Sequence, residues 1–241
     1  HETNLSGISN GTYYDAAITS FYGSHVINGP GNGGMLVTNS NEVYEKARLL
    51  RSWGRSSSLF SDSEAIENRF NIDLDGLQYD AKFVFEEIGY QLEPSEISAA
   101  FALVQFKKLS ENIRARQVNF DLHHEFLSNY DQYFDLPEQN PNAETGWLAF
   151  PAIIKDGSPF TRTDLQIFLE KRNIQTRVVF TGNILRQPGY KNIKCIGAAD
   201  DFVNADRVMR GVILLALHHG LTNEMIDHVH HSISKFLKQF T

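Results

Sequence analysis

The chain has 241 residues, of which 41% are hydrophobic and 21% are charged, a composition typical of one large globular domain or two modest ones. The formal net charge of −7 argues against a broad nucleic-acid-binding surface, while a local basic pocket is still compatible with it. Cys195 is the only cysteine, which excludes an internal disulfide framework and a cysteine-ligated iron–sulfur cluster built from this chain alone. No apolar run is long enough to span a membrane and no signal peptide is visible, so we expect a cytoplasmic location.

Two short runs of strand-forming residues stand near the start of the chain, at 16–22 (AAITSFY) and 33–38 (GGMLVT). The loop between them, residues 23–32, contains three glycines and a proline. Residues 41–51 have apolar side chains at helical spacing and predict a helix. The polar composition of residues 52–75 predicts a surface loop.

A long helix is predicted to begin at Pro94-Ser95-Glu96 and to continue to about residue 127. Residues 129–145 contain two prolines and predict a loop. Strands and helices then alternate: strands are predicted at 147–154, 175–180 and 212–217, and helices at 161–172, at 204–210 and after the capping residue Thr222.

This alternation predicts the α/β class, with a small α/β or α+β domain at the end of the chain. We place the domain boundary near residue 120, inside the long helix. Residues 1–120 and residues 121–241 would then form separate domains.

The loop after the first strand carries the residues that indicate a function. Residues 19–25 read T-S-F-Y-G-S-H, and residues 31–34 read G-N-G-G. This stretch resembles the S-F-x-x-x-K … G-E-G-G pattern of the DegT-type sugar aminotransferases, which have the aspartate-aminotransferase fold. In that family the lysine binds pyridoxal phosphate covalently. Here His25 stands at its position, as in the family's nucleotide-sugar 3-dehydratase branch.

Other segments are similar to the same family in order and spacing: R-S-W-G-R at 51–55, G-Y-Q-L at 89–92, A-A-F-A-L-V-Q at 99–105, G-N-I-L-R-Q-P at 182–188 and H-G-L-T-N-E-M at 219–225. The resemblance runs from about residue 11 to the end. It implies that the chain is the C-terminal portion of such a protein. The fold would then be the later part of a large cofactor-binding domain, including a long connecting helix, followed by a small C-terminal α/β domain.

The exchange of lysine for histidine explains which chemistry the resemblance implies. A lysine amine forms Schiff bases and so favours amino-group transfer. A histidine does not form that bond, but it transfers protons near neutral pH. The implied function is a dehydratase that uses pyridoxal 5′-phosphate and pyridoxamine 5′-phosphate to remove the C3 hydroxyl of a nucleotide-linked 4-keto-6-deoxyhexose, for deoxysugar and surface-polysaccharide biosynthesis. His25 would be the catalytic base, and glutamate would be the amino donor. An ordinary loop histidine is the alternative interpretation of His25.

The resemblance also implies a cofactor-phosphate site. Ser20 matches a serine that bonds the cofactor phosphate in the family, although a strand-end serine needs no such role. Gln91 replaces an asparagine that reaches the cofactor phosphate of the neighbouring subunit, which implies a homodimer with shared active sites. Asn32 replaces the glutamate of the G-E-G-G pattern.

Arg186 and Arg177 are candidate substrate-binding residues, because a planar guanidinium suits a carboxylate or a phosphate. A surface ion pair is the alternative for each. The histidines at 123, 124, 228, 230 and 231 have no spacing that completes a zinc site, so we interpret them as solvated or packing residues.

One dehydrase branch holds an iron–sulfur cluster with cysteines after the W-G-R segment, where this chain has three serines, residues 56–58. We therefore expect no iron–sulfur cluster and no metal. Two alternatives stay open: a sugar aminotransferase-like homologue with changed chemistry, and a non-catalytic or truncated member that only binds a sugar nucleotide or a partner.

Overall fold

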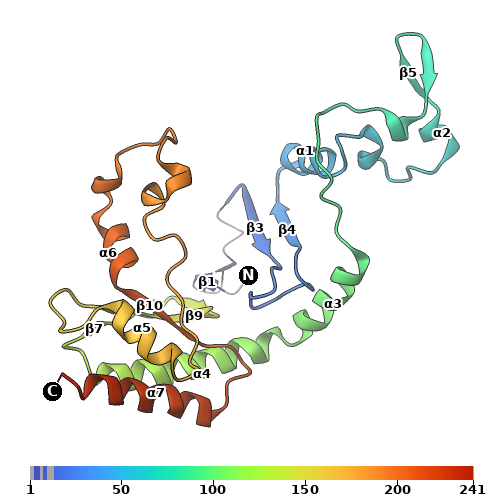
Figure 1. The fold of residues 1–241 in the computed structure, drawn as a ribbon. Helices are drawn as coiled ribbons and strands as arrows, with labels where there is room; N and C mark the ends of the chain where they lie inside the picture. Colours follow the sequence, from blue (N-terminus) through green and yellow to red (C-terminus); the bar gives the residue numbers. More distant parts are fainter. Residues whose placement is uncertain (1–2, 6–7, 10–13, 241) are drawn as a thin grey trace. The chain divides into compact units, whose positions relative to one another are not determined.

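The computed structural model describes residues 3–5, 8–9 and 14–240 (Figure 1). They belong to two units: the first consists mainly of residues 7–107, and the second consists of residues 2–6 and 108–241. The units change between Lys107 and Lys108, earlier in the helical segment than the predicted boundary near residue 120. Each unit is described separately below.

The first unit contains an antiparallel hairpin of β3 (Ala16–Ser20) and β4 (Gly34–Thr38). Helix α1 (Asn41–Arg51) follows, and its N-terminus is capped by the side chain of Ser40, which accepts a hydrogen bond from the backbone N–H of Val43 at 3.3 Å. The predicted strands and helix in this stretch are confirmed to within two residues.

The prediction of a plain loop at 52–75 is wrong. This stretch contains the 3₁₀ helix η2 (Ser56–Leu59), helix α2 (Ile66–Arg69) and strand β5 (Ile72–Leu74), which pairs with β6 (Leu77–Tyr79) before η3 (Ala81–Phe83). Asp75 and Gly76 join β5 to β6 with φ angles of 53° and 89°. An Asp-Gly pair readily adopts left-handed conformations at both central positions of a tight hairpin turn. The pair Asp75-Gly76 was therefore a hairpin signal already present in the sequence.

The predicted long helix consists of two helices. Helix α3 (Glu96–Lys107) belongs to the first unit and α4 (Leu109–Ser128) to the second, with Lys108 between them. In the second unit β1 (Thr3–Leu5) pairs with β8 (Ala143–Thr145). The remaining short strand near the start, β2, covers Ile8–Ser9.

The second unit is built on an antiparallel sheet with the strand order β10-β9-β7. Its strands are β7 (Phe134–Asp135), β9 (Ala149–Ile154) and β10 (Val212–Ala216). The prediction that residues 129–145 form a loop is therefore wrong, because strands β7 and β8 both lie within this segment.

The predicted strand at 175–180 is also wrong. Arg177 makes only an isolated bridge with Leu214. Phe180 has a φ of 41° and Gly182 a φ of 60°, so the chain turns away before a ladder can form. A side chain at Gly182 would place its Cβ 2.5 Å from the Cβ of Met209, so this turn also packs too closely for any other residue.

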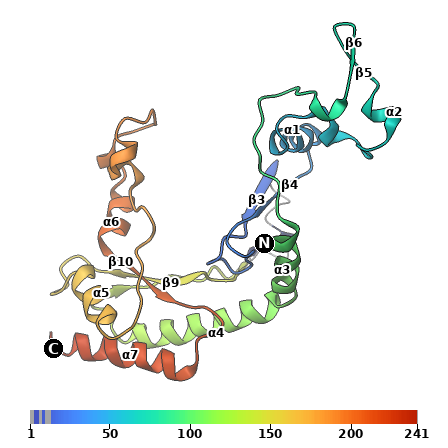
Figure 2. The same ribbon diagram turned by 45° about the vertical axis from the view of Figure 1, so that its right-hand side comes forward.

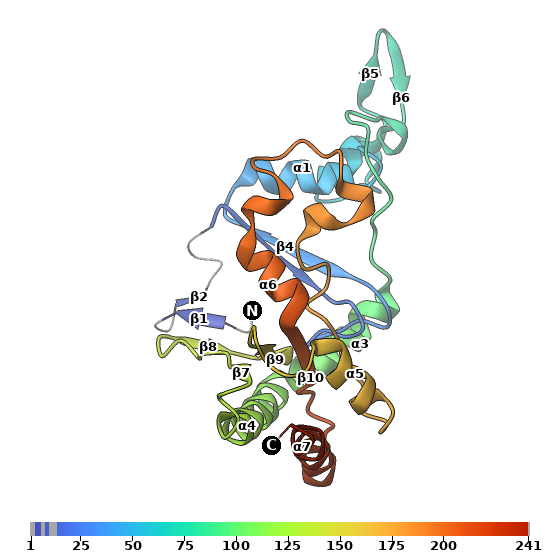
Figure 3. The same ribbon diagram turned by 60° about the vertical axis from the view of Figure 1, so that its left-hand side comes forward.

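Helices α4 and α7 (Asn223–Leu237) lie side by side along the sheet of the second unit, as Figures 1, 2 and 3 all show. Helix α5 (Arg162–Glu170) packs on α7, and α6 (Val203–Gly211) leads into β10. The predicted cap of the last helix is confirmed, since the Thr222 side chain accepts a hydrogen bond from the backbone N–H of Met225. The 3₁₀ helices η4 (Ile184–Arg186), η5 (Pro188–Tyr190) and η6 (Ala199–Asp201) lie between α5 and α6.

The hydrophobic core lies between the sheet and these helices, and its members include Phe150, Leu165, Leu169, Ile213, Leu217 and Ile233. Across the described residues, no helix is both long enough and apolar enough to cross a membrane.

Candidate active site

His25 lies in the loop that connects β3 to β4, and the loop is closed by backbone hydrogen bonds just beyond the strands. The Phe21 N–H donates to the Gly33 carbonyl at 2.9 Å, and the Gly29 N–H donates to the Phe21 carbonyl at 2.8 Å. A Cβ on Gly29 would lie 2.6 Å from the carbonyl oxygen of Asn32, so only glycine fits at this closure. The sequence therefore specifies a folded loop rather than an open one.

Two hydrogen bonds orient His25 within the loop. Its backbone N–H donates to the Tyr22 carbonyl at 2.9 Å, and its ring Nδ1 lies 3.0 Å from the carbonyl oxygen of Ser20. A carbonyl oxygen only accepts, so Nδ1 carries the proton in this contact. Nε2 is then the unprotonated nitrogen of the neutral ring. The arrangement presents His25 as a proton acceptor at Nε2.

Ser20 ends β3 and takes part in the same turn. Its hydroxyl oxygen accepts a hydrogen bond from the backbone N–H of Tyr22 at 3.2 Å. The Tyr22 ring meets the His25 ring edge-on, with 6.0 Å between the ring centroids. The structure therefore brings Ser20 and His25 together, and the hydroxyl hydrogen of Ser20 can still donate to an anion. Sequence reasoning did not identify the part played by Tyr22, because its hydrogen bonds are backbone ones that any residue could make and its ring contact with His25 depends on how the loop folds.

Gln91 lies in a different part of the first unit. A cavity of about 980 Å³ is lined by residues from 32–38, 44–51 and 91–95, including Asn32, Arg48, Arg51 and Gln91. Gln91 forms an isolated bridge with Ser52, which fixes its backbone beside the end of α1. The structure thus places Gln91 with Asn32, and His25 is not among the described residues that line this cavity. The expectation that Gln91 serves a neighbouring subunit stays a prediction.

Arg186 is held by carboxylates of the second unit. Its guanidinium forms ion pairs with Asp206 and, at 2.8 Å, with Asp200. The hydrogen bond from Arg186, with a second one from Asn183, lowers the pKa of Asp206 to about 2. The ion pair considered as the alternative is therefore present, and an anionic ligand of Arg186 would share it with these two aspartates.

Arg177 makes a local contact, in which its Nη1 donates to the Thr176 carbonyl at 3.0 Å. Its backbone pairs with Leu214, and its side chain is exposed. The guanidinium also acts on the Glu170 carboxylate and helps to lower its pKa, so an anionic ligand of Arg177 would share it with that carboxylate. The substrate-binding role assigned to Arg177 and Arg186 stays a prediction.

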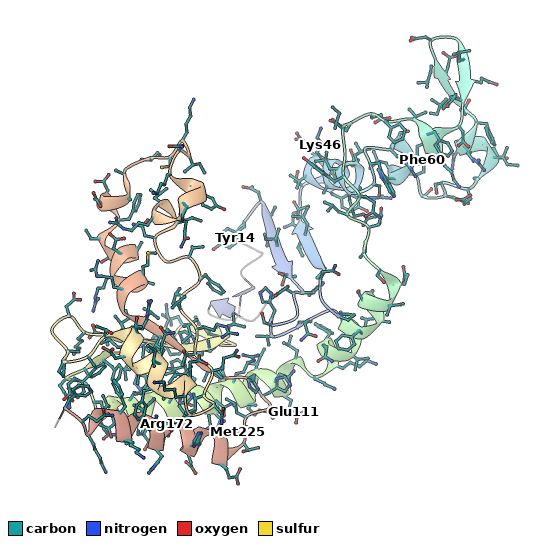
Figure 4. All side chains as sticks on the ribbon, viewed as in Figure 1. Tyr14, Lys46, Phe60, Glu111, Arg172 and Met225 are labelled. Carbon is teal, nitrogen blue, oxygen red and sulfur yellow. The ribbon has the colours of Figure 1, made fainter. Side chains whose placement is uncertain are left out.

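Lys46 is the first lysine in the chain and lies on α1, within the helix predicted at 41–51 (Figure 4). Its ammonium pairs with Glu87. Among the histidines, His123 is buried and bonded to His230, and no group of three or more potential metal-binding side chains is found among the described residues.

Comparison with known proteins places these features in a family. Residues 1–234 match the model of the DegT/DnrJ/EryC1/StrS aminotransferase family. The chain is 32% identical over 241 residues to the lipopolysaccharide biosynthesis protein RfbH of Salmonella typhimurium, covering 99% of this chain and 54% of the relative. It is 35% identical over 230 residues to the dTDP-4-dehydro-2,6-dideoxy-D-glucose 3-dehydratase of Saccharopolyspora spinosa, covering 94% of this chain and 49% of the relative.

The fold is likewise similar to solved structures. The E coli GDP-4-keto-6-deoxy-D-mannose-3-dehydratase with bound hydrated PLP matches with a TM-score of 0.78 at 24% identity, over 95% of this chain and 57% of that one. The aminotransferase fold expected from the sequence is thereby confirmed. The chain spans about half the length of the curated relatives that it matches.

Proposed function

Because the chain belongs to the DegT/DnrJ/EryC1/StrS aminotransferase family, we propose that it forms part of a nucleotide-sugar 3-dehydratase that works with pyridoxamine phosphate. One observation carries the proposal: a histidine replaces the family's lysine, and its Nδ1 contacts the Ser20 carbonyl at 3.0 Å, so that Nε2 is the basic nitrogen. The names of two relatives, both 3-dehydratases, support the same reaction class.

The loop fits a phosphate-bearing cofactor at the end of β3. When bound, pyridoxamine phosphate would supply the amine that condenses with a C4 ketone and the ring that accepts an electron pair. Ser20 has a hydroxyl hydrogen free to donate to a phosphate oxygen, since its oxygen already accepts from the Tyr22 N–H. His25 cannot form a Schiff base, so the cofactor stays unlinked to the protein.

His25 performs the proton transfers in this proposal. Its Nε2 would be the atom that accepts and later returns a proton, while Nδ1–H remains bonded to the Ser20 carbonyl. The resulting imidazolium would give its proton to the C3 hydroxyl group, which would leave as water. The Ser20 carbonyl stabilises the ring's charged form through this transfer, because it accepts from Nδ1–H in both states.

The substrate class follows from the relatives. Their names specify GDP-linked and dTDP-linked keto sugars, so we propose a nucleotide-linked 4-keto-6-deoxyhexose for this protein. Glutamate would restore the amine of the cofactor, and Arg177 would contact an anionic group of one of the two substrates. Gln91 would complete the phosphate site of a second subunit in a homodimer.

The experiment that tests the proposal replaces His25 in two ways. His25→Asn should keep cofactor binding while loss of the C3 hydroxyl slows by about two to four orders of magnitude, the usual contribution of general acid–base catalysis. His25→Lys should also slow dehydration and should make the cofactor reducible onto the protein by borohydride, because the new amine can bond to it. Ammonia release and loss of the hydroxyl would be followed with GDP- and dTDP-linked 4-keto-6-deoxy sugars and glutamate.

His231→Asn is the matched control, since His231 is exposed on α7, far along the chain from the loop. It should leave the rate unchanged. Wild-type activity in His25→Asn would remove this histidine from the mechanism. Amino transfer by the wild-type protein would favour the aminotransferase alternative, and binding of a sugar nucleotide without turnover would favour the non-catalytic one.

A further inference from the structure

A pair of histidines joins α7 to the rest of the second unit. Nδ1 of His123, on α4, lies 2.9 Å from Nε2 of His230, on α7. Nε2 of His123 lies 3.2 Å from the carbonyl oxygen of Ala216, the last residue of β10. His123 is 1% exposed, and His230 is half-buried with its ring stacked on Phe126 at a centroid distance of 4.0 Å. Two titratable rings therefore connect three elements of the core.

The carbonyl of Ala216 determines where the protons of the pair lie. Because it can only accept, His123 must carry its proton on Nε2, and its Nδ1 is then an acceptor. His230 must in turn donate from Nε2 to that Nδ1. The Nδ1 of His230 is therefore the ring nitrogen of the pair at which a first additional proton can enter without breaking either hydrogen bond.

We infer that His123 and His230 form an acid-sensitive latch that holds α7 against α4 and β10, and that the latch opens when the pair takes up a second proton. The first proton enters on Nδ1 of His230 and makes its donation to His123 charge-assisted. The second must bind Nδ1 of His123. It removes the acceptor of the 2.9 Å hydrogen bond and places two like charges at that separation.

The surroundings of the pair agree with this order. Burial lowers the pKa of His123 to about 4, with the charge of His230 as the second cause, while the hydrogen bond to Ala216 opposes them. Burial also lowers the pKa of His230, against the opposing attraction of Asp227 from the preceding turn of α7. Helix α4 contributes His123 itself and the apolar Phe126 ring, β9 contributes the apolar Phe150 ring, and β10 contributes the uncharged Ala216 carbonyl.

The direction of the pH effect follows from linkage. Both histidines titrate near 6.5 when released and at lower pH when the latch is closed, so the closed state binds fewer protons. The stabilisation is fully present above about pH 6.5 and is lost as the pH falls toward about 4. For His123, the opening equilibrium rises roughly tenfold per pH unit in that window, and the lowered pKa of His230 acts in the same direction.

Hydrogen exchange of α7 tests the latch on the whole chain. Protection of the amides of α7, corrected for intrinsic exchange rates, should fall at least about tenfold between pH 7.5 and pH 5.5, relative to the amides of β9. His123→Gln should remove the part of this change that His123 contributes, about tenfold, and leave only the part that the lowered pKa of His230 contributes. Its amide can accept from His230 and donate to the Ala216 carbonyl, but it does not titrate. His231→Gln, at an exposed neighbour on α7, should behave like the wild type.

A second measurement needs no variant. The imidazole ¹⁵N shifts of the wild-type chain should show the Nε2–H form of both rings at pH 7.5, with His123 still neutral at pH 5. A normal titration of His123 near pH 6.5 would overturn the inference. So would an equal loss of α7 protection in the wild type and in His123→Gln, because other groups would then carry the acid sensitivity.

Discussion

The two units differ in how they treat their apolar side chains. The second unit buries a continuous cluster that draws on α4, β7, β9, α5, β10 and α7. The first unit buries Val26, Ile27, Leu49, Ala81 and Val84, and leaves much larger side chains exposed. Ile88 is 95% exposed and Ile97 is 77% exposed. The cores of the two units therefore contribute very unequally to the stability of this chain.

Helices α3 and α5 show the difference most clearly. Helix α5 buries Leu165 and Leu169 on one face and has polar residues on the other. Helix α3 is apolar over most of its surface, yet none of its residues is buried. A helix that is apolar all round normally lies inside a protein. The first unit thus has more apolar surface than its own elements cover, whereas the second unit buries a continuous cluster of large apolar side chains in its own core.

The largest expected effect is on local stability. Amides of the β9–β10 pair should be protected from hydrogen exchange at least about a thousandfold more than amides of the β3–β4 pair, because only the former open with the core. Both strand pairs are antiparallel, so a difference in protection cannot come from a difference in hydrogen-bond pattern. The measurement should be repeated at a tenfold lower protein concentration. If the β3–β4 amides were protected as strongly as the β9–β10 amides at both protein concentrations, the first unit would be as stable as the second.

A pair of leucine truncations should sharpen the comparison. Leu169→Ala in α5 should lower the free energy of unfolding by about 3 kcal/mol, because a fully buried side chain leaves a cavity. Leu103→Ala in α3, where the side chain is 64% exposed, should change it by less than about 0.5 kcal/mol. Urea denaturation followed by circular dichroism measures both. A similar loss in the two variants would mean that α3 is covered in solution.

The smallest expected effect concerns helix caps. Thr161 caps α5 in a box in which its hydroxyl accepts from the Asp164 N–H and the Asp164 carboxylate accepts from the Thr161 N–H at 2.8 Å. Thr161→Ala should lower the free energy of global unfolding by about 1 kcal/mol. Ser40→Ala at α1 removes a similar cap, but it should mainly increase exchange within α1 and leave the global transition in place. A shift of the global transition in both variants would contradict independent opening of the first unit.

The sequence predicted those elements whose signals are local. The hairpin strands around residues 16–38 and the bounds of α1 follow from side-chain type and helical spacing, and the start of α7 follows from its cap. The β5–β6 hairpin was missed although Asp75-Gly76 is a strong turn signal, because the polar composition around it dominated the interpretation. The strand expected at 175–180 failed because Phe180 adopts a left-handed conformation that propensity does not reveal.

The sequence by itself predicted that a histidine stands where the family has a lysine, and from it the class of chemistry that we propose for the loop. Only the tertiary structure decided the protonation geometry. The Ser20 carbonyl orients His25, and Asp206 forms an ion pair with Arg186. His123 is hydrogen-bonded to His230, which lies 107 positions later in the chain. Such contacts join residues that local propensity treats as independent. The His123–His230 contact exists because packing the core takes these rings out of water, where each polar group must find a partner.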